Sequence, residues 1–236
     1  LIAEEALLEK LRLVKDAAEI ESIKKAISIS KSAYKEISEH IMPGLTESYL
    51  AARLDYTARR LGSSAPPFET IVATDTNSSK PHAESGDTKI RKNSIVLIDF
   101  GAKVNGYNSD LTRVVVLGKI DADFKKIYNI VELAQKKAIE SIRPGVPIYK
   151  IDAIARNYIK DKGFGKFFGH ALGHGIGLSV HEDPVINAFN KNSFSEGMVV
   201  TIEPGIYIPG YRGVRIEDMV LVKKRGCEVL SNDYNK

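Results

Sequence analysis

Four acidic residues lie in segments whose other residues are typical of apolar β-strands. Asp99 and Glu203 each end a run of four mostly apolar, β-branched-rich residues, and Asp110 and Glu217 follow them on the next strand-like segments. A carboxylate buried in such surroundings costs free energy unless it is paired or binds a cation. Four carboxylates in one place would repel one another, so the pattern indicates a site for a pair of divalent metal ions.

Three of the five histidines fall in one glycine-rich stretch, and they are His170, His174 and His181. Four glycines within residues 169–177 make a helix costly, so an extended or turning segment is expected there. Glycines also let the backbone approach a crowded site closely. An imidazole beside carboxylates favours Mn²⁺, Fe²⁺, Co²⁺ or Zn²⁺ over Ca²⁺.

An internal repeat predicts how these residues are positioned. Residues 41–62 resemble residues 142–163, and the segment ending at Asp99 resembles the one ending at Glu203. Each half is expected to form a long helix, a Pro-Gly turn, a second helix closed by a glycine, and a β-hairpin. The predicted helices are 16–40 and 46–61, then 122–141 and 148–162; the predicted hairpins are 94–101 with 106–117, then 197–208 with 213–223. Two such units predict an α+β domain with pseudo-two-fold symmetry, in which the acids of both hairpins meet.

The overall composition is that of one large globular domain. The chain has 236 residues and a net charge of +4 from 34 basic and 30 acidic residues spread along it. Without a basic block, nucleic acid is not an expected partner. No apolar run approaches the roughly 20 residues that span a bilayer, so no membrane association is expected. The single cysteine, Cys227, is typical of a reducing compartment, and a cytoplasmic location is expected.

Five motifs, in this order, resemble the family that contains aminopeptidase P, prolidase, methionine aminopeptidase and creatinase. They are Pro81-His82-Ala83, Asp99-Phe100-Gly101 with Asp110, His174-Gly175-Ile176-Gly177 with His181, Glu203-Pro204-Gly205, and Val214-Arg215-Ile216-Glu217-Asp218. The resemblance covers essentially the whole chain and implies the pita-bread fold of that family.

The resemblance also implies the metal ligands and the reaction. Asp99 would bind one metal, His174 and Glu203 the other, and Asp110 and Glu217 would bridge both. Two divalent ions are implied, foremost Mn²⁺, with Co²⁺, Zn²⁺ or Fe²⁺ as alternatives. A metal-bridging hydroxide would attack the scissile carbonyl, and Glu203 would also carry a proton to the leaving nitrogen.

Four further residues match positions that act on the substrate or support the ligands in this family. His170 and His181 correspond to residues that steady the tetrahedral intermediate and the leaving group. His82 corresponds to a substrate-contacting histidine, and Arg215 to a residue that orients the bridging carboxylates.

Within the family, the short hairpin between Glu203 and Glu217 and the entry segment 11–20 resemble the Xaa-Pro branch. The expected substrates are therefore Xaa-Pro dipeptides or short proline-containing peptides. Residues 1–15 resemble a linker from an N-terminal domain and residues 16–236 the catalytic domain, and relatives of this kind imply a homodimer. Val185 stands where many prolidases have an arginine that would pair with a dipeptide carboxylate, which leaves longer substrates open. The alternatives are a methionine aminopeptidase and a non-catalytic peptide-binding module on the same scaffold.

Overall fold

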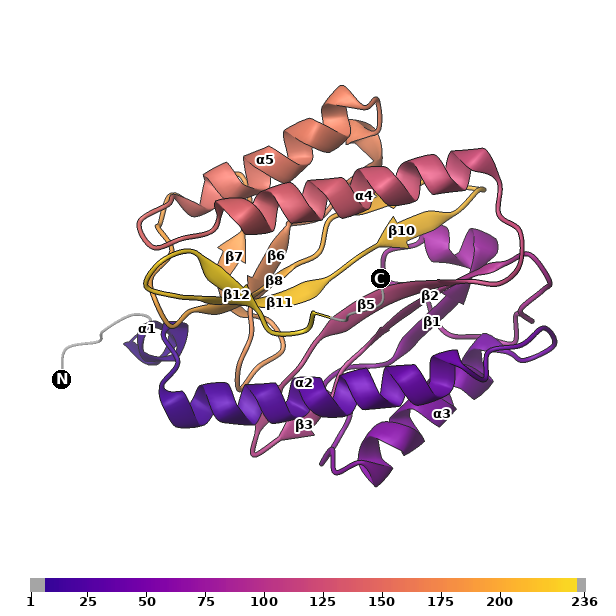
Figure 1. Cartoon of the computed structure of the whole chain (residues 1–236), viewed down its shortest axis with the longest axis horizontal. Helices are drawn as coiled ribbons and strands as arrows, with labels where there is room; N and C mark the ends of the chain where they lie inside the picture. The colour runs from indigo at the N-terminus through magenta and orange to yellow at the C-terminus, as the bar shows by residue number, and fades with distance from the viewer. Residues whose placement is uncertain (1–6, 233–236) are drawn as a thin grey trace.

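The computed structural model describes residues 7–232, which form two similar halves in succession along the chain (Figure 1). After α1 (Leu7–Leu13), the first half contains α2 (Ala17–Ser38), α3 (Glu47–Arg60), β1 (Ile71–Thr74), the 3₁₀ turn η1 (Asp75–Ser79), β2 (Ile95–Phe100), β3 (Lys103–Val104), β4 (Tyr107–Asn108) and β5 (Leu111–Val116). The second half contains α4 (Ala122–Ser141), α5 (Ile148–Asp161), η2 (Gly165–Phe167), β6 (Gly173–Gly175), β7 (Glu182–Ile186), β8 (Val199–Ile202), β9 (Gly205–Tyr207), β10 (Gly213–Arg215), β11 (Asp218–Val222) and β12 (Cys227–Val229). Of the segment 1–15 expected to be a linker, residues 1–6 lie outside the described residues.

The four predicted helices are confirmed to within a few residues, and local sequence explains their ends. Asp16 caps α2 by accepting hydrogen bonds from backbone N–H groups, while the side chain of Glu19 accepts one from Asp16 N in return. Asp121 caps α4 through the N–H of Phe124. Just past the ends of α3 and α5, Gly62 and Gly163 adopt φ values of +111° and +88°, the left-handed conformation that closes a helix.

The strands form two main antiparallel sheets, one in each half, and two short two-stranded sheets, β3-β4 and β9-β10. The first sheet has the order β1-β2-β5, and the second has the order β12-β11-β8-β6-β7. The first predicted hairpin is confirmed as β2 paired with β5, with Asp99 opposite Thr112. The second is interrupted, because β8 gives way to β9 at Glu203 and β10 gives way to β11 at Glu217. The interruptions therefore fall at the two acids that the sequence marks for metal binding.

The strands lie between two helix pairs, α2 with α3 on one side and α4 with α5 on the other (Figure 1). One cluster of buried apolar side chains joins α4 and α5 to the second sheet, through residues such as Ile151 and Val200. A second cluster joins α2 and α3 to the first sheet, through residues such as Leu54 and Ile98. A third cluster crosses between the halves, because Ile23 of α2 packs with Val199 of the second sheet. The site residues lie where the two sheets meet. Within residues 7–232, none of the helices has the length and apolar character needed to cross a membrane.

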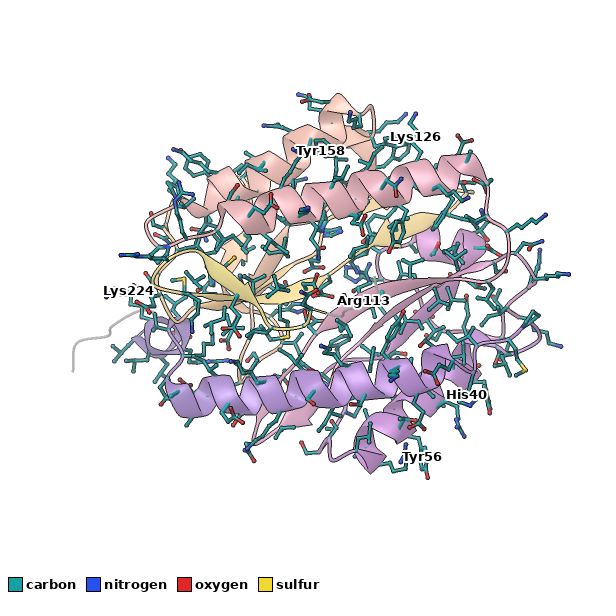
Figure 2. All side chains as sticks on the ribbon, viewed as in Figure 1. His40, Tyr56, Arg113, Lys126, Tyr158 and Lys224 are labelled. Carbon is teal, nitrogen blue, oxygen red and sulfur yellow. The ribbon has the colours of Figure 1, made fainter. Side chains whose placement is uncertain are left out.

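A buried arginine ties the halves together. Figure 2 shows Arg113 in the middle of the molecule, between the two helix pairs. Its Nη2 donates to Asp218 Oδ1 at 2.8 Å and to the carbonyl of Ser231 at 3.1 Å. Its Nη1 also donates to the carbonyl of Glu217. Because breaking a buried ion pair leaves an uncompensated charge, Arg113 fixes the backbone that carries Glu217 against β5.

Candidate metal centre

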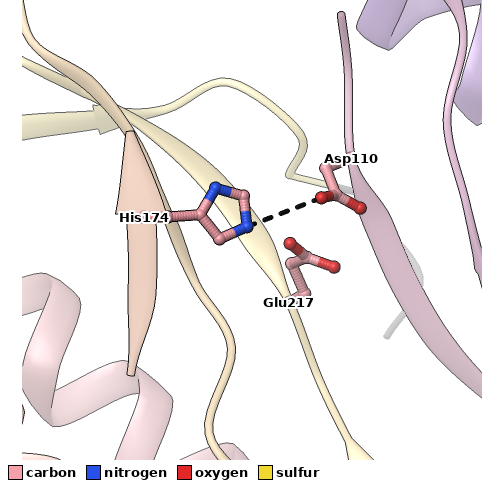
Figure 3. Close-up of side chains that lie close together, drawn as sticks. All are labelled: Asp110, His174 and Glu217. Carbon is pink, nitrogen blue, oxygen red and sulfur yellow. Dashed lines mark ion pairs between the residues drawn. The ribbon is translucent and has the colours of Figure 1, made fainter. Parts of the chain in front are cut away.

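Three predicted ligands from three different segments meet between the sheets (Figure 3). Each of Asp110, His174 and Glu217 offers one ligand atom, and these atoms all lie within 4.8 Å of one another. His174 Nε2 lies 3.7 Å from Asp110 Oδ2 and 3.3 Å from Glu203 Oε1. Asp99 reaches the same place from β2, so both halves contribute carboxylates.

The glycine-rich stretch forms β6, as an extended segment in close contact with its neighbours. A Cβ added to Gly173 would lie 2.0 Å from the carbonyl oxygen of Thr201, and one added to Gly175 would lie 2.0 Å from that of Asp183. The expected close approach of backbone is therefore confirmed. It places His174 beside Thr201, whose Oγ1 accepts from His174 N at 3.1 Å and donates to Glu203 Oε1 at 3.2 Å.

The carboxylates repel one another strongly enough to perturb their ionisation. Burial raises the pKa of Asp110 well above its ordinary value, and repulsion from Glu217 and Asp99 raises it further. The pKa of Glu217 is raised in the same way, by burial and then by the charges of Glu203 and Asp99. Asp99 Oδ1 and Glu217 Oε1 are buried and accept no hydrogen bond from any described residue. Unsatisfied oxygens in a repelling acidic group fit divalent cations.

The hydrogen bonds of His174 indicate which ring nitrogen faces the centre. Nδ1 lies 3.0 Å from the carbonyl of Gly175, which can only accept, so Nδ1 carries the proton. Nε2 is left facing Asp110 and Glu203, the arrangement usual for a metal-binding histidine. Burial by itself would lower the pKa of His174, but the hydrogen bond and charge of Glu203 raise it overall. For Glu203, burial acts to raise the pKa, and His174 outweighs it, so that the pKa is lowered.

Arg215 connects the ligands of the two halves. Its side chain is buried, and its Nη2 donates to Asp99 Oδ2. Its Nε donates to Thr112 Oγ1 at 3.1 Å, and Thr112 in turn donates to Glu217 Oε2 at 2.7 Å. The Arg215 guanidinium therefore orients Asp99 on β2 directly. It orients Glu217, which precedes β11, through the hydroxyl of Thr112.

Tyr207 was not singled out from the sequence, yet it bridges Arg215 and His170. Its hydroxyl accepts from Arg215 Nη1 at 2.8 Å and lies 3.1 Å from His170 Nε2. Because His170 Nδ1 lies 2.7 Å from the carbonyl of Ala171, Nδ1 carries the proton and Nε2 accepts from Tyr207. Burial raises the pKa of Tyr207 to about 12 and lowers that of His170, so the pair is neutral near pH 7. The signal available in the sequence was the position of Tyr207 two residues after Gly205 in the Glu-Pro-Gly motif.

All nine residues predicted as site residues line one cavity of about 690 Å³. They are the ligands Asp99, Asp110, His174, Glu203 and Glu217, the histidines His82, His170 and His181, and Arg215. The ring of His181 packs edge-on against that of His174, with centroids 4.4 Å apart. Burial lowers the pKa of His181. His82 follows Pro81, whose carbonyl accepts from Arg215 Nη1 at 3.1 Å.

Glu47 is a second residue that sequence reasoning missed, and it anchors the loop that carries His82. This fully buried carboxylate accepts from Thr74 N at 2.7 Å, Asn77 Nδ2 at 2.9 Å and Gly86 N at 3.2 Å. Both ends of the loop are thereby held to the start of α3. The sequence did contain a signal for Glu47, because this acid breaks the internal repeat. The equivalent position in the second half is the apolar Ile148.

Comparison with known proteins agrees with this architecture of two halves around a metal centre. Residues 21–224 match metallopeptidase family M24. The chain is 43% identical over 224 residues to the Xaa-Pro dipeptidase of Pyrococcus horikoshii, covering 95% of this chain and 64% of that protein. It superposes on the X-Pro aminopeptidase of Thermotoga maritima with a TM-score of 0.97 and 42% identity, covering 100% of this chain and 67% of that one. For the prolidase of Pyrococcus furiosus the TM-score is 0.95 at 42% identity, covering 98% and 68%.

The fold and the site thus define a class of protein. Its members have a duplicated α+β scaffold in which both halves contribute carboxylates to one buried centre. The chain belongs to metallopeptidase family M24, and its fold is the predicted pita-bread fold. It spans about 64% of the length of the similar Pyrococcus dipeptidases.

Proposed function

We propose that the chain hydrolyses the bond between an N-terminal residue and proline in dipeptides or short peptides, with two divalent metal ions. The observation that carries this proposal is the convergence of five metal-ligand residues and three histidines on one cavity. The names of the similar proteins, Xaa-Pro dipeptidase, X-Pro aminopeptidase and prolidase, supply the substrate class.

In this proposal the two metal ions would be held by Asp99, Asp110, His174, Glu203 and Glu217. When bound, the ions would supply an activated water nucleophile and polarise the scissile carbonyl. Mn²⁺ is the proposed metal, with Co²⁺, Zn²⁺ and Fe²⁺ as alternatives, because one imidazole with four carboxylates suits transition metals.

Side chains of the protein would then transfer protons and orient the substrate and the ligands. Glu203 has a lowered pKa, so it is ionised near neutral pH and can accept a proton and pass it to the leaving nitrogen. His170 and His181 are proposed to steady the tetrahedral intermediate and the leaving group, and His82 is proposed to contact the substrate. Arg215 orients Asp99 and, through Thr112, Glu217. We further propose that the protein acts as a homodimer, which light scattering of the purified protein would test.

The test is to prepare metal-free protein, restore Mn²⁺ or Co²⁺, and measure cleavage of Ala-Pro, Ala-Pro-Ala and Met-Ala peptides. Metal-dependent release from an Xaa-Pro substrate is expected, and Glu203→Gln should abolish it. The matched control is Glu140→Gln, which makes the same change on the exposed face of α4 and should leave turnover intact. Cleavage of Met-Ala alone would instead indicate a methionine aminopeptidase. Metal binding without any turnover would indicate a peptide-binding module.

A further inference from the structure

His170 lies in a connection, residues 168–172, that joins η2 to β6 without regular secondary structure. The end of this connection is held to β7, because Leu172 N donates to the carbonyl of Ile186 at 2.8 Å. A side chain that acts on a reacting group has to be held in place to a fraction of an ångström. The contacts that fix the rest of the connection therefore decide where the His170 ring lies.

Arg156 of α5 fixes the backbone of this connection. Its Nη1 donates to the carbonyl of Phe168 at 3.1 Å, and its Nη2 donates to the carbonyl of His170 at 2.8 Å. The two hydrogen bonds span Gly169, an exposed glycine whose backbone has more conformational freedom than that of other residues. The described residues that line the metal-site cavity do not include Arg156, so its effect on that cavity would pass through His170.

Ring packing gives Arg156 a second route to His170. The guanidinium carbon of Arg156 lies 4.3 Å from the centroid of the Phe168 ring. The Phe168 ring in turn meets the His170 ring edge-on, with centroids 5.1 Å apart and 84° between the ring planes. Phe168 is 3% exposed, so its ring has little room to move away. The guanidinium and the imidazole are thus held on the same aromatic ring.

Asp152, one turn earlier on α5, fixes the direction of the Arg156 guanidinium. Its Oδ2 accepts from Arg156 Nε at 2.8 Å, and its Oδ1 accepts from Arg156 Nη2 at 2.7 Å. Asp152 is 1% exposed, and a carboxylate buried to that extent is costly unless it is paired. Because the pair is planar and joined at two points, the remaining N–H groups of the guanidinium point in a defined direction, toward the carbonyls of Phe168 and His170.

We propose that Arg156, oriented by Asp152, is a positioning residue that sets the place of the His170 imidazole in the metal-site cavity. The proposal rests on the proposed function, in which His170 steadies the tetrahedral intermediate. A group that acts only on the intermediate stabilises the transition state and contributes little to binding of the intact peptide. Loss of Arg156 should therefore lower kcat with little change in KM. Metal affinity should also be preserved, because α5 carries none of the proposed metal ligands.

The first test measures kcat and KM on an Xaa-Pro peptide with the manganese-loaded protein. Arg156→Met keeps the length of the side chain and removes its donors, so kcat should fall by about 10-fold to 100-fold while KM changes less than about threefold. Arg156→Lys keeps the charge but cannot pair with Asp152 at two points and also reach both carbonyls, so its kcat should fall as well. The matched control is Lys150→Met, which removes a positive charge from the exposed face of the same helix and should leave kcat unchanged.

Two results of this test would overturn the proposal. One is a kcat in both Arg156 variants equal to that of Lys150→Met. The other is a fall in kcat matched by an equal loss of Mn²⁺ affinity, measured by competition with a chelator, because that would indicate a general disturbance of the metal centre.

A second measurement requires neither turnover nor metal. The ring protons of the five histidines are observed by NMR in the metal-free protein, and the signal of His170 is assigned with His170→Gln. This signal should move in both Arg156 variants, because the imidazole changes its place relative to the Phe168 ring, and it should stay unchanged in Lys150→Met. An unmoved His170 signal in both Arg156 variants would refute the positioning role. If the wild-type protein cleaved no Xaa-Pro peptide, the proposed function would fail, whereas a displaced His170 signal would still support the role of Arg156.

Discussion

The variant Gly173→Ala tests whether the close packing of β6 positions the proposed metal ligands. The new Cβ would lie 2.0 Å from Thr201 O, whereas real Cβ contacts are essentially never shorter than 3.0 Å, so the strands must separate by about 1 Å. Thr201 cannot yield freely, because its Oγ1 bonds both His174 N and Glu203 Oε1. The substitution should therefore move two proposed metal ligands at once.

The expected effects follow from that displacement. A shift of about 1 Å in a reacting site costs about 100-fold in turnover. Overpacking of a close strand contact costs about 1–3 kcal/mol of the free energy of unfolding. Gly169→Ala is the matched control. Gly169 lies in the same stretch and has no positive φ, and a Cβ added there would have no neighbouring atom within 4 Å. It alters the unfolded chain in the same way, so the difference between the variants isolates the contact.

The assays are urea denaturation, competition for Mn²⁺ against a chelator, and kcat/KM on an Xaa-Pro peptide. Gly173→Ala should show weaker metal binding, lower turnover and a lower urea midpoint than Gly169→Ala. If the two variants behaved alike in all three assays, the reasoning that a glycine at 173 sets the ligand geometry would be refuted.

Three further outcomes are expected. Glu47→Ala removes the acceptor of the buried Thr74 N and of the half-buried Gly86 N, while Asn77 Nδ2 keeps the carbonyl of Glu84. It should lower the free energy of unfolding by about 2 kcal/mol, measured by urea denaturation against the exposed control Glu39→Ala; a change equal to the control would contradict this. The pKa of Asp121 is lowered, chiefly by the hydrogen bond from Tyr211. Its contribution to the free energy of unfolding is therefore complete above the ordinary pKa of 3.8 and is lost as the pH falls through the lowered pKa. Asp121→Asn should therefore flatten the fall in stability between about pH 5 and pH 2, and an unchanged slope would count against the assignment. Removing metal that was present at 100 times its Kd should lower the free energy of unfolding by about 2.7 kcal/mol, and identical urea curves with and without chelator would argue against a metal centre.

Local sequence predicted the helices well because their signals are local. Capping residues, glycine stops and the internal repeat each lie within a few residues of the elements they define. The repeat also placed Asp99 and Glu203 as equivalents, and both now line one cavity. The nine predicted site residues line that one cavity, and they stood out because they belong to motifs whose residue types are chemically unusual for strands.

Other features could not be predicted because they depend on contacts between distant segments. The strand β7 contains Pro184 and has no clear alternation, and only its place at the edge of the second sheet tolerates that proline. Glu47 reads as an ordinary first-turn acid of a helix, and its burial comes from a loop about 30 residues away. The packing of α1 next to β7 joins segments 170 residues apart, through Arg12 and Glu182.

The candidate metal site lies on the boundary between the two halves, and the proposed ligands are divided between them. The halves are joined in sequence by the short connection 117–121 between β5 and α4, and each supplies only part of the ligand set. Asp99 and Asp110 belong to the first half, while His174, Glu203 and Glu217 belong to the second. Metal ions held by ligands from both halves would add to the contacts that already join them, which include the ion pair of Arg113 with Asp218. Separation of the halves would therefore also release the metal, and the site would assemble only when the halves are correctly joined.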